Sequence, residues 1–276
     1  MLKARKEIES NLKLIDIVVI LLDARAPFSC RNPMLESMVR SKKTILVFNK
    51  IDLADPAVYE KQVHLLRSQK QVVVTMNSLS GEGKKQVLKA IETLFHPVVE
   101  AMQAKGRKRR AARIMVAGVP NTGKSTFLNN IVGKKTAVTG AKPGITKGKQ
   151  WVRIRDDVEI LDTPGVMWPK IENEEQGMKL ALLNIVGENA YDPYYIALFL
   201  LSLLQKHYPS VLQERFREKN LDEPLEIIMQ NIARQRGHLL PQAHLDVDKT
   251  ANVLLQEFRQ GKLGRISLDL TEQIFP

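Results

Sequence analysis

Cysteine and aromatic residues are scarce in this sequence, and long apolar runs are missing. The 276 residues include one cysteine, Cys30, so no intrachain disulfide can form and a reducing compartment is expected. We expect Cys30 to be a packed or half-exposed thiol rather than a nucleophile. Apolar runs such as Ile17–Leu22 are far shorter than the roughly 20 residues of a membrane-spanning helix. The first residues, MLKARKEIES, lack the apolar region of a signal peptide, so we predict a cytoplasmic protein that does not bind membranes.

Acidic residues are also fewer than basic residues. Lys and Arg number 42 against 30 Asp and Glu, a formal net charge of +12. Such a charge favours a polyanionic partner such as nucleic acid, although a merely basic solvated surface is the alternative. Residues 105–113, KGRKRRAAR, contain six basic residues and no acidic one, and residues 132–155 also lack Asp and Glu. Residues 105–113 could be a solvated linker or a patch that neutralises phosphates, and the sequence leaves both open.

The apolar pattern divides the chain into an alternating part and a helical part. Strands are expected at 15–22, 44–48, 72–76, 112–117 and 158–161, with an edge strand at 150–155, and helices at 2–14, 34–40, 56–68, 84–95 and 125–132. This alternation predicts an α/β fold with a doubly wound parallel sheet over residues 1–172. Beyond residue 172 only helices are expected, at 175–186, 193–207, 210–219, 225–236 and 247–260, which predicts a small all-α domain over 173–276.

Residues 118–125, GVPNTGKS, match the phosphate-binding loop G-x-x-x-x-G-K-[ST] between an expected strand and an expected helix. The two glycines let backbone N–H groups converge on phosphate oxygens, and Lys124 can place its ammonium against the β- and γ-phosphates. The helix would add its positive N-terminus. The nucleotide-binding residues expected here are Pro120, Asn121, Thr122, Gly123, Lys124, Ser125 and Thr126.

A second motif, Asn49-Lys50-Ile51-Asp52, follows an expected strand and matches the guanine-reading pattern NKxD. Asp52 would accept hydrogen bonds from N1–H and the N2 amino group of guanine, two donors that adenine does not present in that arrangement. Asn49 would steady the base and the neighbouring loops, and the stem of Lys50 would cover the base. One strand later, Asn77-Ser78 could offer a backbone N–H to guanine O6, or could simply cap a helix.

Three further residues complete the expected chemistry. Asp162 ends an apolar strand in Asp162-Thr163-Pro164-Gly165, where its carboxylate would hold Mg²⁺ through water while the Gly165 N–H contacts the γ-phosphate. Ser125 and Thr146 would supply hydroxyls to the same Mg²⁺. We expect Lys124, Thr146 and Gly165 to act on the transferred phosphate.

These motifs occur in an unusual order, because the base-reading motif precedes the phosphate loop, whereas ordinary GTPases have the reverse. A circular permutation produces this order without changing the fold, since the termini of a compact domain often lie close together. Residues 95–113 would join the old termini, and the new exit would follow Gly165. The segment that contacts the γ-phosphate would then lead directly into the helical domain, so nucleotide state could bias how that domain is held.

The chain resembles the circularly permuted GTPases, and in particular the bacterial ribosome biogenesis GTPase A family, also called YlqF. The resemblance covers nearly the whole sequence and rests on LIDIV, DARAP, NKID, GVPNTGKST, PGIT, QWV, LDTPGVMWPK and GKLGRIS. It implies a helical C-terminal domain that binds ribosomal RNA, and a role in late assembly of the large (50S) ribosomal subunit. The implied partners are GTP or GDP and the precursor of the large subunit, and we expect the chain to act as a monomer.

The resemblance also bears on hydrolysis. Val166 stands where many GTPases carry a glutamine that orients the attacking water, and valine cannot hydrogen-bond that water. Related enzymes with an apolar residue there are similar in using K⁺ held by a phosphate-loop asparagine, the place of Asn121. The family's histidine for hydrolysis lies in an FPGHM-like segment before the position of Met1, and the five histidines present are expected at the surface or at caps. These five are His64, His96, His207, His238 and His244.

Three functions therefore compete. The leading one is a GTPase that is slow alone, is stimulated by K⁺ and ribosomal particles, and places or releases an RNA-binding domain. The second is a GTP-gated RNA-binding scaffold with little hydrolysis, which Val166 favours. In the third, the helical domain binds an acidic protein or membrane surface. Asp52 disfavours an ATP-dependent function.

Overall fold

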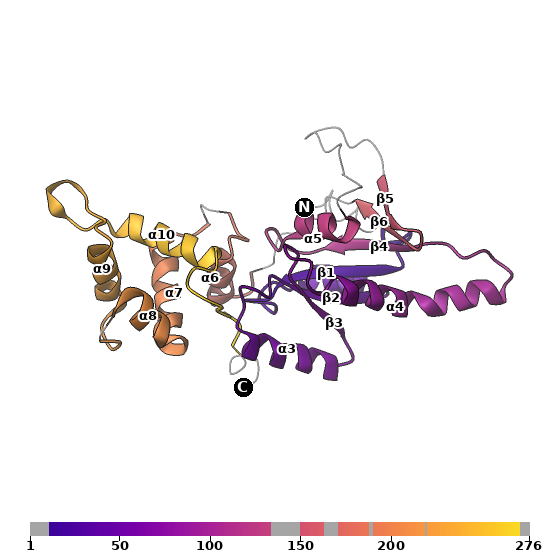
Figure 1. The fold of residues 1–276 in the computed structure, drawn as a ribbon, viewed down its shortest axis with the longest axis horizontal. Helices are drawn as coiled ribbons and strands as arrows, with labels where there is room; N and C mark the ends of the chain where they lie inside the picture. The colour runs from indigo at the N-terminus through magenta and orange to yellow at the C-terminus, as the bar shows by residue number, and fades with distance from the viewer. Residues whose placement is uncertain (1–10, 134–149, 163–170, 188–189, 219, 271–276) are drawn as a thin grey trace.

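The computed structural model describes residues 11–133, 150–162, 171–187, 190–218 and 220–270. Within them one mixed sheet has the strand order β3-β2-β1-β4-β6-β5 (Figure 1). The first five of these strands are parallel, and β5 pairs antiparallel with β6 at the edge. The strands span β1 Ile17–Asp23, β2 Lys43–Asn49, β3 Val72–Met76, β4 Ala112–Ala117, β5 Gln150–Arg155 and β6 Val158–Asp162. The expected α/β sheet is confirmed, with an antiparallel strand at the predicted edge.

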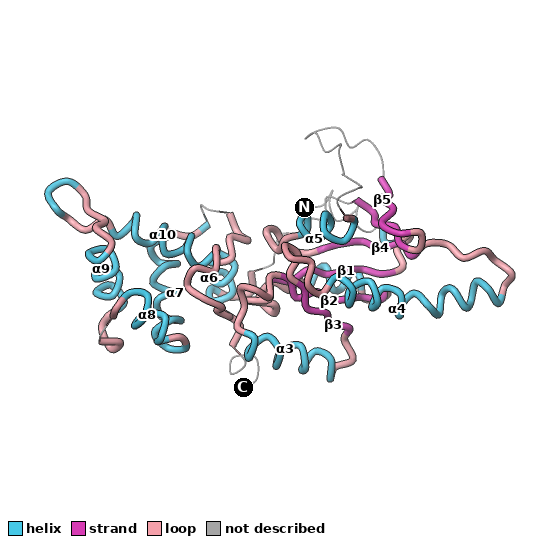
Figure 2. The backbone as a smooth tube through the Cα atoms, viewed as in Figure 1, coloured by secondary structure: helices cyan, strands magenta, loops and turns pink. Residues whose placement is uncertain are grey.

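Helices cover both faces of the sheet, as a doubly wound fold requires (Figures 1 and 2). Successive residues of β1 alternate between the two faces: Ile17, Val19 and Leu21 pack with α4 and α5, whereas Val18, Ile20 and Leu22 pack with α2 and α3. All of β1 is buried, which explains its uninterrupted apolar sequence. These helices span α2 Pro33–Val39, α3 Pro56–Ser68, α4 Lys84–Ala104 and α5 Lys124–Val132.

Helix α4 differs from its expected end at residue 95. It continues through Pro97 to Ala104, although proline removes one helical hydrogen bond. Val98 and Val99, one turn beyond the expected end, pack on the same apolar cluster as the rest of the helix. This packing outweighs the local cost of Pro97, so most of the expected joining segment is helix. In Figure 1 the outer part of α4 extends past the sheet before the chain returns to β4.

The strand order supports the circular permutation. Strand β4, which leads into the phosphate loop, lies in the middle of the sheet, with β6 on one side and β1 on the other. Strand β2, which leads into residues 49–52, lies beyond β1. The loops at the carboxyl ends of β2 and β4 therefore flank β1 at one edge of the sheet, although more than 60 residues separate them in sequence.

The rest of the chain is helical and forms a lobe beside the sheet part (Figure 1). Its helices span α6 Glu174–Leu182, α7 Pro193–His207, α8 Pro209–Phe216, α9 Leu225–Gln235 and α10 Val247–Arg259, with a 3₁₀ turn η2 at Pro241–Ala243. Their buried side chains join the apolar cluster on the α2 and α3 side of the sheet. Among the described residues no helix is both long and apolar enough to cross a membrane.

Residues 261–270, which follow α10, return to the loops after β1 and β2. The N–H groups of Ile266 and Leu268 donate to the carbonyls of Leu53 and Arg25, at 3.0 and 2.6 Å. The Asp269 carboxylate accepts from the Phe28 and Ser29 N–H groups at 2.8 Å. The C-terminal segment therefore packs on the sheet part, and the boundary at 172/173 remains a prediction.

Candidate nucleotide-binding site

The phosphate loop begins where β4 ends, and two of its positions need glycine. Gly118 and Gly123 have φ angles of +152° and +93°. A Cβ on Gly118 would lie 2.6 Å from the Leu21 carbonyl oxygen, and one on Gly123 would lie 2.5 Å from the Asn49 side-chain nitrogen. Both contacts are too close, so the loop can approach β1 and β2 only with glycine. The motif's glycines are thus explained by packing as well as by phosphate access.

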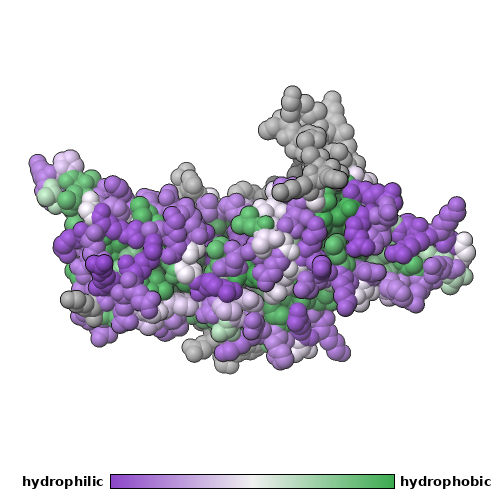
Figure 3. Space-filling view, in the orientation of Figure 1, coloured by the Kyte–Doolittle hydropathy of each residue, from purple (hydrophilic) through white to green (hydrophobic). Residues whose placement is uncertain are grey.

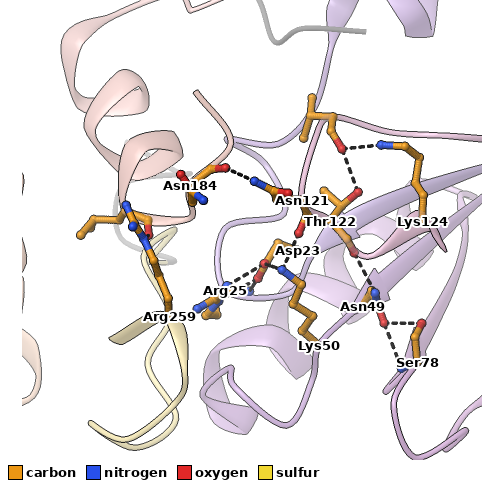
Figure 4. Close-up of polar contacts among 12 residues, drawn as sticks. Asp23, Arg25, Asn49, Lys50, Ser78, Asn121, Thr122, Lys124, Asn184 and Arg259 are labelled. Atoms are coloured by element: carbon orange, nitrogen blue, oxygen red, sulfur yellow. Dashed lines mark hydrogen bonds and ion pairs between the residues drawn. The ribbon is translucent and has the colours of Figure 1, made fainter. Parts of the chain in front are cut away.

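Lys124, at the start of α5, points back over the loop (Figure 4). Its ammonium donates to the carbonyls of Gly118 and Val119 at 3.0 and 2.8 Å. Partial burial lowers the pKa of Lys124 to about 8. The Lys124 ammonium, held by these carbonyls at the phosphate loop, is placed to bind a phosphate. A phosphate bound beside it would raise the pKa of Lys124 again, because a nearby negative charge favours the protonated form.

This shift predicts that GDP affinity falls as pH rises through 8. Free Lys124 loses its proton above about pH 8, whereas Lys124 against phosphate keeps it, so binding at alkaline pH must take up a proton. Between pH 7 and 8.5 we expect a roughly fourfold rise in Kd, measured by titration calorimetry in buffers of different ionisation enthalpy. Lys124→Arg stays charged and should show neither effect. Equal affinity and no proton uptake in the wild-type chain would contradict the shift.

Asn49 connects three loops from a fully buried position (Figure 4). Its amide nitrogen donates to the Thr122 carbonyl at 2.7 Å, and its carbonyl oxygen accepts from the Ser78 N–H and hydroxyl at 3.1 and 2.7 Å. The Asn77 side chain accepts from the Leu79 and Ser80 N–H groups, so it caps a turn and not a helix, because α4 begins only at Lys84. Asn49 therefore holds the base-reading loop at a fixed distance from the phosphate loop, as its expected role requires.

Asp52 itself is exposed beyond Asn49 and Lys50. The backbone on either side of it is held by Arg265, whose guanidinium donates to the carbonyls of Ile51 and Ala54 at 2.9 Å each. The carboxylate thus stands on a loop that is fixed from both sides, by Asn49 and by the C-terminal segment. Its role as reader of guanine remains a prediction.

The structure adds a buried ion cluster that the sequence reading did not assign. Asp23, at the end of β1, is fully buried and accepts from Arg25 at 2.9 and 2.8 Å, while Lys50 lies 3.0 Å away. Burial alone would raise the pKa of Asp23, but attraction to Arg25 and Lys50 outweighs it and holds that pKa well below its usual range. The signal was present: Asp23 ends a fully apolar strand beside the strand that leads to residues 49–52.

Lys50 connects this cluster to the phosphate loop. Its ammonium donates to the Asn121 carbonyl at 2.5 Å, and its backbone is left-handed, with φ of 60°. The Asn121 amide nitrogen in turn donates to the Asn184 carbonyl in the segment after α6 (Figure 4). Arg259 of α10 holds the end of α6, just before that segment, through the carbonyls of Ala181 and Leu182. The phosphate loop therefore contacts the helical part through Asn121.

The expected Mg²⁺ ligands are only partly described. Ser125 is exposed at the first turn of α5, and Met115 pairs with Leu161, so Asp162 ends the strand next to the phosphate loop. Hydroxyl and carboxylate oxygens are the hard ligands that Mg²⁺ prefers, so the assignment of Ser125 and Asp162 to Mg²⁺ remains a prediction. Thr146, Gly165 and Val166 lie outside the described residues. Within the described ranges no three acidic, histidine or cysteine side chains cluster as a self-contained metal site.

The remaining titratable candidates behave as expected from sequence. Cys30 is buried, and burial raises its pKa, which disfavours a nucleophilic thiolate. His238 contacts the Thr250 hydroxyl at 2.9 Å, and His96 lies 3.5 Å from Glu100 on the exposed face of α4. Neither contact places an imidazole at the phosphate loop.

Comparison with known proteins agrees with this geometry. A family model described as 50S ribosome-binding GTPase matches residues 113–230. Ribosome biogenesis GTPase A of Priestia megaterium is 38% identical over 98% of this chain and 94% of its own length, and that of Bacillus cereus is 35% identical over 99% and 92%. The solved structure of GNP-bound YlqF from T. maritima superposes with a TM-score of 0.70 at 28% identity, over 97% of this chain and 98% of that one. On these full-length similarities, and on a phosphate loop and base-reading loop brought together in permuted order, the chain belongs to the ribosome biogenesis GTPase A family.

Proposed function

We propose that the chain hydrolyses GTP and uses the nucleotide as a switch in assembly of the large ribosomal subunit, where it binds ribosomal RNA. The observation that carries the proposal is the Asn49 bridge, which joins the base-reading loop to the phosphate loop. A bound nucleotide would span this bridge, with guanine at Asp52 and the phosphates at Lys124. The name of the relatives, ribosome biogenesis GTPase A, supports the ribosomal role, as does the description of the matching family model, 50S ribosome-binding GTPase.

The residues of this chain would divide the work on the phosphates. The loop from Gly118 to Ser125 orients the triphosphate through backbone N–H groups, and Lys124 stabilises the negative charge that develops on the transferred phosphoryl group. Mg²⁺, when bound at Ser125 and Asp162, would supply further charge neutralisation. Thr146 and Gly165 would close on the γ-phosphate. The Asn121 side chain could offer its carbonyl oxygen to K⁺ while its nitrogen faces Asn184.

The same contacts suggest how the switch is transmitted. Residues 1–172 would form the GTPase domain and residues 173–276 the RNA-binding part. Asn121 contacts Asn184, and Arg25 lies over the Phe258 ring at 5.1 Å, so two links join the site to the helices. A change in the phosphate loop on GTP binding would change the first of these links. Nucleotide state would thus bias how the RNA-binding part is held.

Co-sedimentation with large-subunit particles tests the proposal. We expect more of the chain to sediment with a non-hydrolysable GTP analogue than with GDP, and GTP turnover to rise with K⁺ and with particles. Equal sedimentation in both states would contradict the switch. Nucleotide-dependent sedimentation with no hydrolysis in single-turnover assays with particles would instead establish the GTP-gated scaffold, which Val166 favours.

A further inference from the structure

The end of the sheet opposite the nucleotide site carries a groove of about 730 Å³ with four arginines in its lining. Arg109 and Arg110 come from the segment before β4, and Arg153 and Arg155 come from the edge strand β5. Two aspartates, Asp156 and Asp157, line the turn between β5 and β6. Figure 3 shows hydrophilic residues over the end of the molecule from which the outer part of α4 extends. The lining contains a single apolar residue, Ile154.

Two nearby arginines build the framework of the groove. Arg110 donates to both carboxylate oxygens of Asp16 at 2.7 and 2.8 Å and lies 5.4 Å from the Phe95 ring centre. Arg113 lies 5.1 Å from the ring centre of Trp151, and its N–H donates to Asp16 at 2.9 Å. These contacts fix the returning segment to β1 and to the edge strand. The groove is therefore a built surface rather than a solvated linker.

The other arginines are about half exposed, and each lies near an aspartate of the turn, Arg153 at 4.0 Å from Asp156. The side chains of Arg109, Arg153 and Arg155 are 53%, 62% and 49% exposed. Arg109 and Arg155 flank one carboxylate, Asp157, at 3.8 and 3.1 Å. Two guanidinium groups held around one small anion are arranged as phosphate requires, because their planar forks match phosphate oxygens as they match carboxylate. The exposed basic residues Lys105, Arg107 and Lys108 extend the same charge along the chain.

We propose that this arginine groove binds the phosphate backbone of RNA, as a second contact apart from the helical part. The inference rests on the proposed RNA-binding function and places part of the RNA-binding surface on the sheet part of the chain. Strand β4 separates the groove from the phosphate loop by six residues, about 20 Å. The chain could therefore hold RNA in this groove in either nucleotide state. RNA is favoured over an acidic protein because protein interfaces need apolar anchors at their centre, and this lining offers only Ile154.

The test uses the full chain with GDP and a labelled RNA duplex of about 16 base pairs, because backbone contacts do not depend on sequence. The paired reversal Arg109→Glu and Arg153→Glu should weaken binding at least about tenfold near 0.1 M salt. It should also make the slope of log affinity against log salt shallower by about two, one for each lost phosphate contact. Asp156→Asn, at the exposed turn, should strengthen binding. Anisotropy over a salt series measures all three effects.

A matched pair, Arg40→Glu and Lys61→Glu, makes the same change in net charge at exposed positions on the α2 and α3 side of the sheet. It should change RNA affinity much less than the groove pair, and both pairs should keep normal GDP affinity. Unchanged RNA affinity in the groove variant would overturn the inference and leave the proposed function standing. Loss of particle binding with unchanged RNA affinity would assign the groove to an acidic protein surface and also overturn it. A wild-type chain that binds no RNA would overturn both proposals.

Discussion

Asp52→Asn is expected to weaken GTP binding by about 100-fold or more and to confer binding of xanthosine triphosphate. The carboxylate would accept from two donors of guanine, whereas an amide would face one of them with its own NH₂ group. A mismatched polar pair in a specific site costs several kcal/mol, whereas xanthine, which has an oxygen in place of the N2 amino group, restores the match. Competition of both nucleotides against a fluorescent analogue measures the exchange.

Asp55→Asn is the matched control, because it removes a carboxylate three residues away. Asp55 caps α3 by accepting from the Ala57 N–H at 2.9 Å, and asparagine caps helices equally well. It should leave the preference for guanine unchanged. If Asp52→Asn weakens GTP and xanthosine triphosphate alike, Asp52 supports the loop rather than reading the base. If ATP competes with GTP in the wild-type chain, the guanine-reading site is wrong altogether.

The phosphate loop and the strand pattern could be predicted from sequence because their signals are local. Gly118 and Gly123 stand at fixed spacing between an apolar strand and a helix, and the central strands β1 and β4 are nearly uninterrupted apolar runs. The permuted order followed from comparing two such motifs. The extension of α4 past Pro97 could not be predicted from a local signal, because it depends on the packing of Val98 and Val99 against residues that are distant in sequence.

The links between the parts of the chain were beyond sequence reading for a different reason. Arg265 holds the carbonyls of Ile51 and Ala54 across more than 200 residues, and Asn121 reaches Asn184 through a backbone oxygen. Such contacts involve main-chain atoms, which carry no residue signature, and single polar side chains, which have no periodicity. A composition change near residue 172 therefore suggests a clean boundary, whereas the C-terminal segment crosses it to pack beside the base-reading loop.

These links give the buried ion cluster a double role. Asp23 neutralises Arg25, which lies over Phe258 of α10, and also holds Lys50, which reaches the phosphate loop at Asn121. One carboxylate thus contributes to packing of the helices on the sheet and to the position of the base-reading loop. Its removal should affect stability and nucleotide binding by separable amounts.

Asp23→Asn is expected to destabilise the chain by about 3–5 kcal/mol, because it leaves the buried Arg25 cation without its partner. Melting temperature should fall by roughly 10 °C in a thermal shift assay at pH 7. The low pKa of Asp23 in the folded chain means that this stability is present above the unfolded value near 3.9 and is lost as pH falls below it. The difference between wild type and variant should therefore shrink in acid.

The paired variant Asp23→Leu with Arg25→Met separates the two roles. Removing both buried charges together avoids an unpaired cation, so much of the lost stability should return. Lys50 would still lack Asp23, and since its side chain is 26% exposed it can turn toward solvent at little cost. We therefore expect the paired variant to bind GDP more weakly than the wild-type chain, although its stability is restored. If the free energy of unfolding of Asp23→Asn lies within about 1 kcal/mol of the wild-type value, water or relaxation compensates the charge of Arg25. If the paired variant binds GDP as tightly as the wild-type chain, Asp23 does not position Lys50.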